Sequence, residues 1–505
     1  MDPFSLISSY PTLLLVAIAS FVFYWYGTRT HDFFSSQGIP GPKPIPFIGN
    51  MWGMWRKNVA ENDIALYKKY GKIFGIYEGV VPNLFVTDPK LIRSILIKDS
   101  GRFINRRDFT LRAQYLRKMV TVVRDQEWKD IRSAVTPTFT IGKIKKMSVL
   151  MKQCADSLSN RFAVLAETRG QLDAKDEFCT YPVDVISTCA YATKLDLDDE
   201  ENLFVTNAKK VLISPVTKSP MILSLVLFPR LIKALRSRIM IIKEYEYFRD
   251  LVLNVIRERT KSSEKFNDFI EMAYEAFSRA TVEGTSKPKW TREQVDEMVT
   301  GQCIVFLFAG FDSVSTTLTA TSFLLATHPE IQEKLYQLIV EKFEQYGDVC
   351  HEMVVEIPYL DQILNESLRL YSPAPRLERE CNQDVTYDGV HIKKGTLVTV
   401  PIYAVHHSEE FYPEPEKFDP DRWDPANDNQ PNPYSFLSFG FGPRNCAGMK
   451  FAQEEIKIAL CTLLRKFEFY PVAETPDKLH MDFGFLIGNQ PTNAVVGIKL
   501  RQGSQ

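Results

Sequence analysis

The chain has 505 residues, of which 45% are hydrophobic and 24% are charged. This composition can bury a large core and excludes disordered and fibrous proteins. Its 61 lysines and arginines nearly balance its 62 aspartates and glutamates, so the overall charge does not favour nucleic-acid binding. The eight cysteines form no Cys-x-x-Cys pair, which argues against a disulfide scaffold or a structural zinc site and favours a reducing compartment.

The amino-terminal segment is strongly apolar. No residue between Asp2 and Arg29 is charged, and Tyr10 to Tyr26 is almost wholly apolar with aromatic side chains at its far end. That length just spans a bilayer core, so we expect residues 1–28 to form a membrane anchor. A cleaved signal peptide is the alternative, because Ala17-Ile18-Ala19 has small residues at both ends, but no basic region precedes the apolar run.

Residues 38–50 are predicted to form a proline-rich linker. Six of the nine residues from Gly38 to Pro46 are glycine or proline, which excludes a helix and indicates a stiff connection. The linker leads into residues 51–505, which we expect to form the functional domain. Basic residues after the anchor predict that this domain lies in the cytosol.

Helical patterns dominate the remaining chain. They cover Asn62–Tyr70, Pro89–Asp99, Gly142–Leu165, Arg236–Arg259, Thr291–Thr327, Pro329–Tyr346 and Leu360–Tyr371. Strand-like alternation occurs at Ile73–Thr87 and Val385–Pro401. The predicted fold class is therefore mainly α with minor β (α+β). A second apolar stretch, Leu212–Leu231, is interrupted by three prolines and is expected either to dip into the bilayer or to pack in the core.

The longest predicted helix begins after Thr291, which forms a capping-box pattern with Gln294, and runs to the residue before Pro329. At ~1.5 Å per residue it would be roughly 55 Å long and would cross the molecule. Its middle is apolar on every face, yet Asp312 and Ser313 follow at the same depth. A hydrogen bond from Ser313 to the preceding turn would explain the hydroxyl without a function.

Cys446 lies among glycines and a proline, just before a helical pattern. Free N–H groups at the helix start and the charge of Arg444 are expected to stabilise a thiolate and lower the pKa of this cysteine. The small residues Gly442, Ala447 and Gly448 leave room for a large flat group, such as a metal-bearing macrocycle. The alternative for a lone cysteine is a small buried hydrophobic residue.

The decapeptide from Phe439 to Gly448 matches Phe-x-x-Gly-x-Arg-x-Cys-x-Gly, and the chain thereby resembles the cytochrome P450 superfamily. The resemblance extends over nearly the whole chain. It implies a cytochrome P450 fold with a long central helix, in which residues 51–505 form a haem-binding catalytic domain and Cys446 ligates the iron of haem b. Phe439, Gly440 and Ala309 would contact the haem. Residues 136–143 and 105–107 look most like the clan of the drug-metabolising family 3.

Other residues extend the resemblance. Glu366 and Arg369, with Arg422 further along the chain, are similar to the buried Glu-Arg-Arg triad that would fix the geometry of the cysteine loop. Alone, the Glu-x-x-Arg pattern also fits an ordinary surface ion pair. Trp128 and Arg132 resemble the pair that binds a haem propionate.

Three further arginines would complete the anion-binding clamp, because a guanidinium group matches a carboxylate well. They are Arg444, Arg379 and Arg106, and for the last two a solvated surface position is the alternative.

The segment from Ala309 to Ser313 resembles the oxygen-activation motif, so Asp312 and Ser313 are implied to be catalytic residues that deliver protons. Ser313 stands where the family has threonine, and its rotamer is less constrained without the methyl group. Phe308, Ala309 and Ala374 are implied to line an apolar substrate pocket, with packing as the alternative role for each.

The resemblance implies a membrane-anchored haem-thiolate monooxygenase that inserts one atom of O2 into lipophilic small molecules such as xenobiotics, steroids or fatty acids. No Gly-x-Gly-x-x-Gly opens a helix after a strand, so electrons from NADPH would come through a separate flavoprotein, NADPH–cytochrome P450 reductase. Cytochrome b5 is a further candidate partner. The expected location is the endoplasmic reticulum membrane, with a single amino-terminal span and the catalytic domain on the cytosolic face.

Two other functions remain open. A haem-thiolate isomerase or dehydratase would rearrange a peroxide without external electrons, although Asp312 and Ser313 argue against an enzyme that needs no proton delivery. A non-enzymatic membrane protein could keep the fold for binding, but Cys446 and the triad residues argue against that function.

Overall fold

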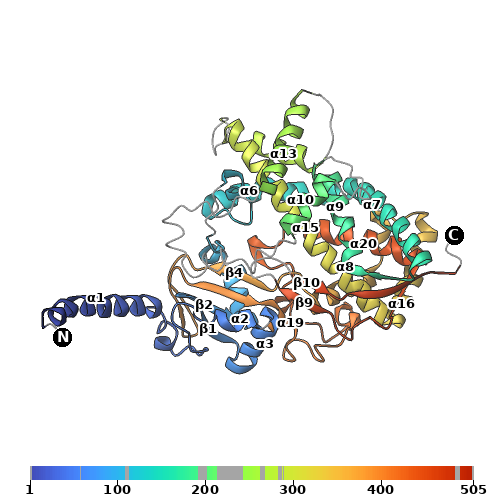
Figure 1. The fold of residues 1–505 in the computed structure, drawn as a ribbon. Coiled ribbons are helices and arrows are strands. Elements are labelled where there is room, and N and C mark those ends of the chain that lie inside the picture. Colours follow the sequence, from blue (N-terminus) through green and yellow to red (C-terminus); the bar gives the residue numbers. More distant parts are fainter. Residues whose placement is uncertain are drawn as a thin grey trace.

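The computed structural model describes residues 3–56, 58–108, 113–191, 202–212, 243–261, 268–281, 287, 289–483 and 489–502. Most helices gather around the long helix α15 (Arg292–Thr327), whereas the largest sheet lies at the side of the molecule from which α1 (Pro3–Thr28) projects (Figure 1). The predicted class, mainly α with minor β, is confirmed. The predicted stretch Leu212–Leu231 lies beyond the described residues, apart from Leu212 itself.

Helices occur along the chain from the amino-terminal segment to the residues just after the cysteine loop. Besides α1 and α15, the described ones are, in chain order, α2 (Met51–Arg56), α3 (Val59–Tyr70), α4 (Pro89–Arg93), α5 (Gln114–Arg117), α6 (Asp125–Val135), α7 (Ile141–Thr168), α8 (Ala174–Phe178), α9 (Thr180–Tyr191), α10 (Leu203–Leu212), α13 (Lys243–Thr260), α14 (Phe269–Arg279), α16 (Pro329–Tyr346), α17 (His351–Val355), α18 (Pro358–Leu370), α19 (Ile402–His406) and α20 (Met449–Lys466). Short 3-10 helices include η6 (Pro420–Trp423) and η8 (Gly442–Arg444).

The strands form small sheets. They are β1 (Ile73–Glu78), β2 (Val81–Val86), β3 (Gln171–Asp173), β4 (Arg376–Glu380), β5 (Val385–Tyr387), β6 (Val390–Ile392), β7 (Leu397–Pro401), β8 (Phe467–Tyr470), β9 (His480–Phe483), β10 (Asn489–Thr492) and β11 (Val495–Leu500). The largest sheet has the order β1-β2-β7-β4, in which β2 and β7 are parallel and the other pairs are antiparallel. A second sheet has the order β3-β11-β8 and joins residues far apart in the sequence.

Helix α15 begins with the predicted capping box, in which Thr291 Oγ1 accepts from the N–H of Gln294 and the Gln294 side chain accepts from the N–H of Thr291. Its first half contributes Val299 and Leu307 to one hydrophobic core, and its second half contributes Leu318 to another. A helix shared by two cores is buried on nearly all sides, so any accessible residue in its middle marks an opening in the packing.

Within the described residues, α15 is the one helix whose length and composition would also suit a membrane span, but 67% of its most apolar window is buried in the molecule. This burial identifies α15 as a core helix. The apolar part of α1, Thr12–Thr28, is shorter than the 18 residues of such a window. Its side chains are nevertheless exposed, Leu15 by 65% and Phe21 by 69%.

Candidate functional site

The loop that carries Cys446 is closed by its own backbone. The N–H of Cys446 donates to the carbonyl oxygen of Phe439 at 2.8 Å. Gly440 and Gly442 have positive φ angles of 67° and 71°, which other residues rarely adopt. A Cβ atom at Gly442 would stand 1.8 Å from the carbonyl oxygen of Leu96. Glycine is therefore required at position 442, where the loop touches the backbone of another segment.

Cys446 is an exposed residue, whereas the other seven cysteines are buried or half-buried. Burial of the thiol by the surrounding protein is nevertheless the largest influence on the pKa of Cys446, and it raises this pKa. The N–H of Gly448 and the charges of Arg132 and Arg106 lower this pKa by less. The expectation of a lowered pKa is thus wrong for this structure, since burial outweighs the helix start and the nearby charges.

Arg444 is buried and ties the cysteine loop to the chain before α6. Its Nε, one Nη and the other Nη donate to the carbonyl oxygens of Ile104, Val120 and Val123 at 2.8, 3.0 and 2.7 Å. Its guanidinium carbon lies 4.2 Å from the ring centroid of Trp128, close enough for a cation–π contact. Arg444 and Trp128, both predicted to bind an anion, therefore lie against each other.

Four guanidinium groups gather near this loop, those of Arg106, Arg132, Arg379 and Arg444. Arg379 is buried, which excludes a surface position for it, and Arg106 is half-buried. Burial and the charge of Arg106 lower the pKa of Arg379 to about 9. Burial and the neighbouring arginines lower the pKa of Arg444 to about 8. Within the described ranges, none of the four forms an ion pair with a carboxylate.

Strand alternation explains why Arg379 has no carboxylate partner. Successive side chains of β4 point to opposite faces of the sheet, so Arg379 and Leu377 share one face. Leu377 lies against the cysteine loop, 3.5 Å from where a Cβ of Gly440 would be. The charged residues on the other face are all paired: Arg376 with Asp63, Glu378 with Arg107, and Glu380 with Arg124.

In the middle of α15, Ala309 is exposed and Ser313 one turn later is half-buried. Ser313 Oγ donates to the carbonyl oxygen of Ala309 at 2.6 Å, so the local hydrogen bond considered from the sequence is confirmed. Since the helix is otherwise buried, these two residues mark an opening on one of its faces.

Asp312 faces another way from Ser313. Its Oδ1 accepts from Nε2 of Gln490 at 3.0 Å and lies 3.5 Å from Nζ of Lys175. The two predicted catalytic residues are therefore adjacent in sequence but have different surroundings. Lys175 and Gln490 are residues that the sequence analysis missed, and no local pattern identified either.

The other predicted pocket and haem contacts are partly accessible. Phe308, Ala374 and Phe439 are half-buried and each packs against a hydrophobic core. The ring centroid of Phe308 lies 5.3 Å from that of Tyr245 on α13. Packing is thus at least part of the role of each residue.

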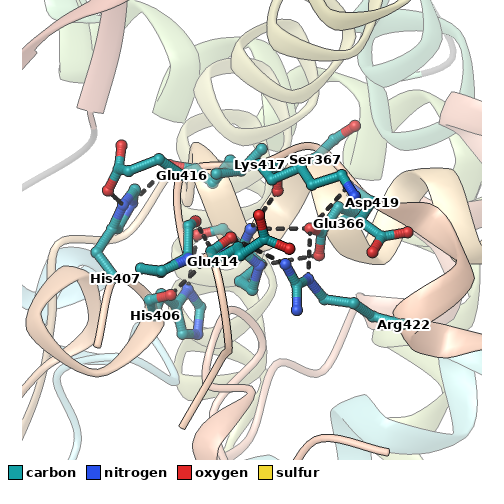
Figure 2. Close-up of polar contacts among 12 residues, drawn as sticks. Glu366, Ser367, His406, His407, Glu414, Glu416, Lys417, Asp419 and Arg422 are labelled. Atoms are coloured by element: carbon teal, nitrogen blue, oxygen red, sulfur yellow. Dashed lines mark hydrogen bonds and ion pairs between the residues drawn. The ribbon is translucent and has the colours of Figure 1, made fainter. Parts of the chain in front are cut away.

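The predicted triad is assembled in the interior. Nε and Nη2 of Arg369 donate to the two carboxylate oxygens of Glu366 at 2.9 and 2.8 Å, and Arg422 Nε donates to Glu366 Oε1 at 3.1 Å. Figure 2 shows Arg422 and Asp419 reaching Glu366 from the same segment. Trp423 adds an indole N–H donor at 2.9 Å. The Glu366 carboxylate is buried and both of its oxygens accept hydrogen bonds. Glu366 and Arg369 are therefore not the ordinary surface ion pair that the Glu-x-x-Arg pattern also allowed.

A histidine that the sequence analysis missed extends the triad toward the cysteine loop. His406 is fully buried; its Nδ1 lies 3.0 Å from the carbonyl oxygen of Arg369, and its Nε2 lies 2.9 Å from the N–H of Leu437. The carbonyl oxygen of Leu437 in turn accepts from the N–H of Gly440. The triad is thus connected through His406 to the loop of Cys446.

These residues fit a haem group. An exposed cysteine, four arginines without carboxylate partners among the described residues and an opening at Ala309 would suit the iron, the propionates and the flat body of a haem. Arginine keeps its proton in proteins, so like charges gathered in this way require an anionic partner.

Comparisons with known proteins agree with this geometry. Residues 39–496 match the family model for cytochrome P450. Cytochrome P450 3A41 of Mus musculus is 38% identical over 503 residues, which cover 98% of this chain and 97% of that protein. Cytochrome P450 3A7 of Homo sapiens is 36% identical over 484 residues, which cover 94% of each chain. The similarity to relatives with a 3A designation therefore spans nearly the whole length.

Proposed function

Because this chain belongs to the cytochrome P450 family and is a monooxygenase, we propose that it holds haem b through the thiolate of Cys446 and oxidises lipophilic small molecules. When bound, the thiolate-ligated haem supplies the activation of O2 and the cleavage of its O–O bond. Cys446 would hold the iron as a thiolate, although burial raises the pKa of this residue in the structure.

The arginine cluster is the observation that carries this proposal. Arg106, Arg132 and Arg379 would bind the propionates, which would relieve the mutual repulsion of these guanidinium groups. Arg444 adds charge and holds the cysteine loop through its three carbonyl contacts. Trp128 supports the guanidinium group of Arg444 with the face of its ring. In this proposal Phe439, Gly440 and Ala309 would contact the bound haem.

Proton delivery is assigned to Asp312 and Ser313. Ser313 Oγ passes protons on the accessible face of α15, and its bond to the carbonyl of Ala309 orients the hydroxyl. Asp312 resupplies Ser313 after turning away from Gln490 and Lys175. Phe308, Ala309 and Ala374 exclude water and hold the apolar substrate, whose class is xenobiotic, steroid or fatty acid.

Partners and location complete the proposal. Electrons come from NADPH through NADPH–cytochrome P450 reductase, with cytochrome b5 as a second donor. Residues 1–28 form a single span in the endoplasmic reticulum membrane, residues 38–50 a linker and residues 51–505 the cytosolic catalytic domain. The exposed apolar side chains of α1 support the span. The linker lies on the sheet, since the carbonyl oxygen of Pro40 accepts from the N–H of Gly75 at 2.8 Å.

The carbon monoxide difference spectrum of the reduced protein tests the thiolate ligand. The wild type should show the red-shifted band of a thiolate-ligated haem, and Cys446→Ala should lose it. Cys350→Ala, which changes another cysteine that is not fully buried, is the matched control and should keep it. An unchanged spectrum in Cys446→Ala would show that another residue ligates the iron.

Turnover separates the monooxygenase from the isomerase or dehydratase. Product should form only when both NADPH and the reductase are present. Equal turnover of an organic peroxide substrate without them would favour the isomerase, whose chemistry consumes no external electrons.

A further inference from the structure

The main chain of Val120 connects the long helix α15 to the cysteine loop. Its N–H donates to Oε1 of Gln302 on α15 at 3.0 Å. Its carbonyl oxygen accepts from Nη1 of Arg444, two residues before Cys446, also at 3.0 Å. One residue thus uses both of its main-chain polar groups to join two elements that are far apart in the sequence.

Gln302 holds the α15 side of this connection. It is only 1% exposed, and its Nε2 donates to the carbonyl oxygens of Lys118 at 2.6 Å and Met298 at 3.2 Å. Because the N–H of Val120 can only donate and the two carbonyls can only accept, the orientation of the side-chain amide is determined. Two of its three partners belong to the segment Lys118–Val120, so Gln302 fixes this segment to α15.

The preceding residue, Gly301, gives independent evidence of close packing at the same place. A Cβ atom at Gly301 would stand 2.5 Å from the carbonyl oxygen of Tyr115 and 3.2 Å from the nitrogen of Met119. Without a Cβ, the main chain of residues 115–119 lies directly on the backbone of α15. Hydrogen bonds and a close backbone contact therefore fix the same segment to the helix.

The cysteine loop depends on this segment through Arg444. Two of the three carbonyl groups that accept from Arg444 are those of Val120 and Val123, and the N–H of Val123 donates to the carbonyl oxygen of Met119. A shift of the segment away from α15 would therefore move two of the three acceptors of Arg444.

Gln302 also lies on the helix face that carries the opening. It precedes Ala309 by seven positions, and residues with this spacing share one face of a helix. The separation is about 10 Å along the helix axis. Gln302 therefore connects the accessible face of α15 with an arginine of the proposed propionate clamp.

We propose that Gln302 is a positioning residue for the haem site. It acts through Val120, whose bond to Arg444 holds the cysteine loop in place relative to the face of α15 that carries Ala309. This inference rests on the proposed function, because the group whose retention it explains is the haem. Loss of the amide of Gln302 would release Val120, displace Arg444 and weaken the hold of the protein on haem.

The rate at which the full-length, haem-loaded protein loses haem to excess apomyoglobin tests this role. Gln302→Met removes the amide group but keeps a side chain of similar length. We expect haem release to become about fivefold faster, as for the loss of one or two neutral hydrogen bonds that support the site. An unchanged rate would overturn the proposal.

Gln332→Met on α16 is the matched control. Gln332 is also 1% exposed; its Oε1 accepts from the N–H of Phe469 at 2.9 Å, and its Nε2 donates to the carbonyls of Leu325 and Phe469 at 3.0 and 2.8 Å. Both substitutions should lower the urea midpoint to a similar extent, but Gln332→Met should release haem at the wild-type rate. Equally faster release in both variants would mean that lost stability is the cause and would overturn the proposal.

Gly301→Ala disturbs the same contact without removing a hydrogen bond. Alanine favours a helix more than glycine does, so this variant should fold even if Gln302→Met does not. Its methyl group would displace the main chain of Tyr115, and haem release should again be faster. Gly142→Ala, on α7 with open space around the added atom, should match the wild type. An unchanged rate in Gly301→Ala would overturn the proposal if Gln302→Met does not fold.

The carbon monoxide spectrum of the wild type distinguishes failure of this inference from failure of the proposed function. Absence of the red-shifted band from the wild type would contradict the thiolate-ligated haem itself. A normal wild-type band together with equal haem release in Gln302→Met and wild type would contradict only the role of Gln302.

Discussion

The main-chain N–H of Leu437 donates a 2.9 Å hydrogen bond to Nε2 of His406. Since an N–H can only donate, Nε2 accepts, and the single ring proton lies on Nδ1, which donates to the carbonyl oxygen of Arg369. His406 is therefore neutral, and only one tautomer satisfies both neighbours. A protonated ring would have two donors and would face the N–H of Leu437 with one of them.

Acid should destabilise the protein through His406. Burial, followed by the charges of Arg369 and His407, lowers its pKa well below the usual value. As pH falls through about 6.5, the unfolded chain gains a proton at this residue while the folded protein does not, so the free energy of unfolding falls by up to ~1.4 kcal/mol per pH unit. Between pH 7.5 and 5.5, the free energy of unfolding measured in urea should fall less for His406→Asn than for the wild type.

His391→Asn, on β6, is the control for this experiment and should keep the wild-type decline with pH. The same decline in His406→Asn and wild type would mean that His406 does not carry this pH dependence.

Trp423→Phe should weaken the triad without removing an aromatic ring. The indole N–H to Glu366 is lost, whereas packing against Phe436, at a centroid distance of 4.8 Å, remains possible. We expect the free energy of unfolding to fall by about 1.5–3 kcal/mol, as for a hydrogen bond to a charged group. Trp290→Phe, whose ring packs against Phe277, should have a smaller effect, and equal losses in both variants would contradict a special role for Trp423.

Glu455→Met should stabilise the protein at pH 7. Glu455 is fully buried and neither carboxyl oxygen has a partner within the described part of the chain. Burial raises its pKa well above the usual value, so the folded protein keeps a proton that the unfolded chain releases, and stability falls as pH rises above about 4.3. The expected gain in the free energy of unfolding is about 1–3 kcal/mol.

That gain should shrink at pH 5, where the unfolded chain retains more of the proton. Glu454→Gln is the matched control, because the neighbouring carboxylate is paired with His351 at 2.8 Å; this variant should lose stability. Destabilisation by Glu455→Met at pH 7 would show that the carboxyl group has favourable contacts.

Ser313→Ala should increase the hydrogen peroxide released per molecule of product, because the proposed proton donor is lost. Ser313→Thr should restore coupling to the wild-type value or better, since the added methyl group restricts the rotamer. Ser322→Ala removes a similar hydroxyl-to-carbonyl bond on the same helix, at 2.6 Å, and should leave the ratio unchanged. An unchanged ratio in Ser313→Ala would remove Ser313 from proton delivery.

Deleting residues 1–26 should weaken membrane association, because it removes the exposed apolar side chains of α1. Co-sedimentation with phospholipid vesicles measures the effect. We expect part of the protein to remain bound through the second apolar stretch, residues 212–231. Complete release to the supernatant would contradict a membrane contact at that stretch.

Features set by neighbouring residues were predictable from the sequence. Thr291 and Gln294 fix the start of α15 by a local capping box, and Cys446, Glu366 and Arg369 belong to short motifs. The predicted helix at Pro329–Tyr346 has the observed bounds. Local spacing is enough in these cases because the contacts are within one turn of the chain.

Features set by distant segments were not predictable in this way. Arg444 was expected to act on the neighbouring thiol, but its donors are used by carbonyl groups more than 300 residues away. The pKa of Cys446 depends on burial, which no spacing encodes. His406 and Lys175 carry no motif of their own, and their roles become visible only after α19 and α8 pack beside the triad and α15.

The hydrogen bond between Asp312 and Gln490 also bears on the order of events during synthesis. Translation proceeds from the amino terminus, so α15 leaves the ribosome long before β10 exists. During that interval the carboxylate of Asp312 lacks its amide donor, and the last strands to emerge complete its environment. A chain that stops before residue 489 would therefore contain every motif proposed to contact the haem and would still lack the amide that holds the Asp312 carboxylate in position.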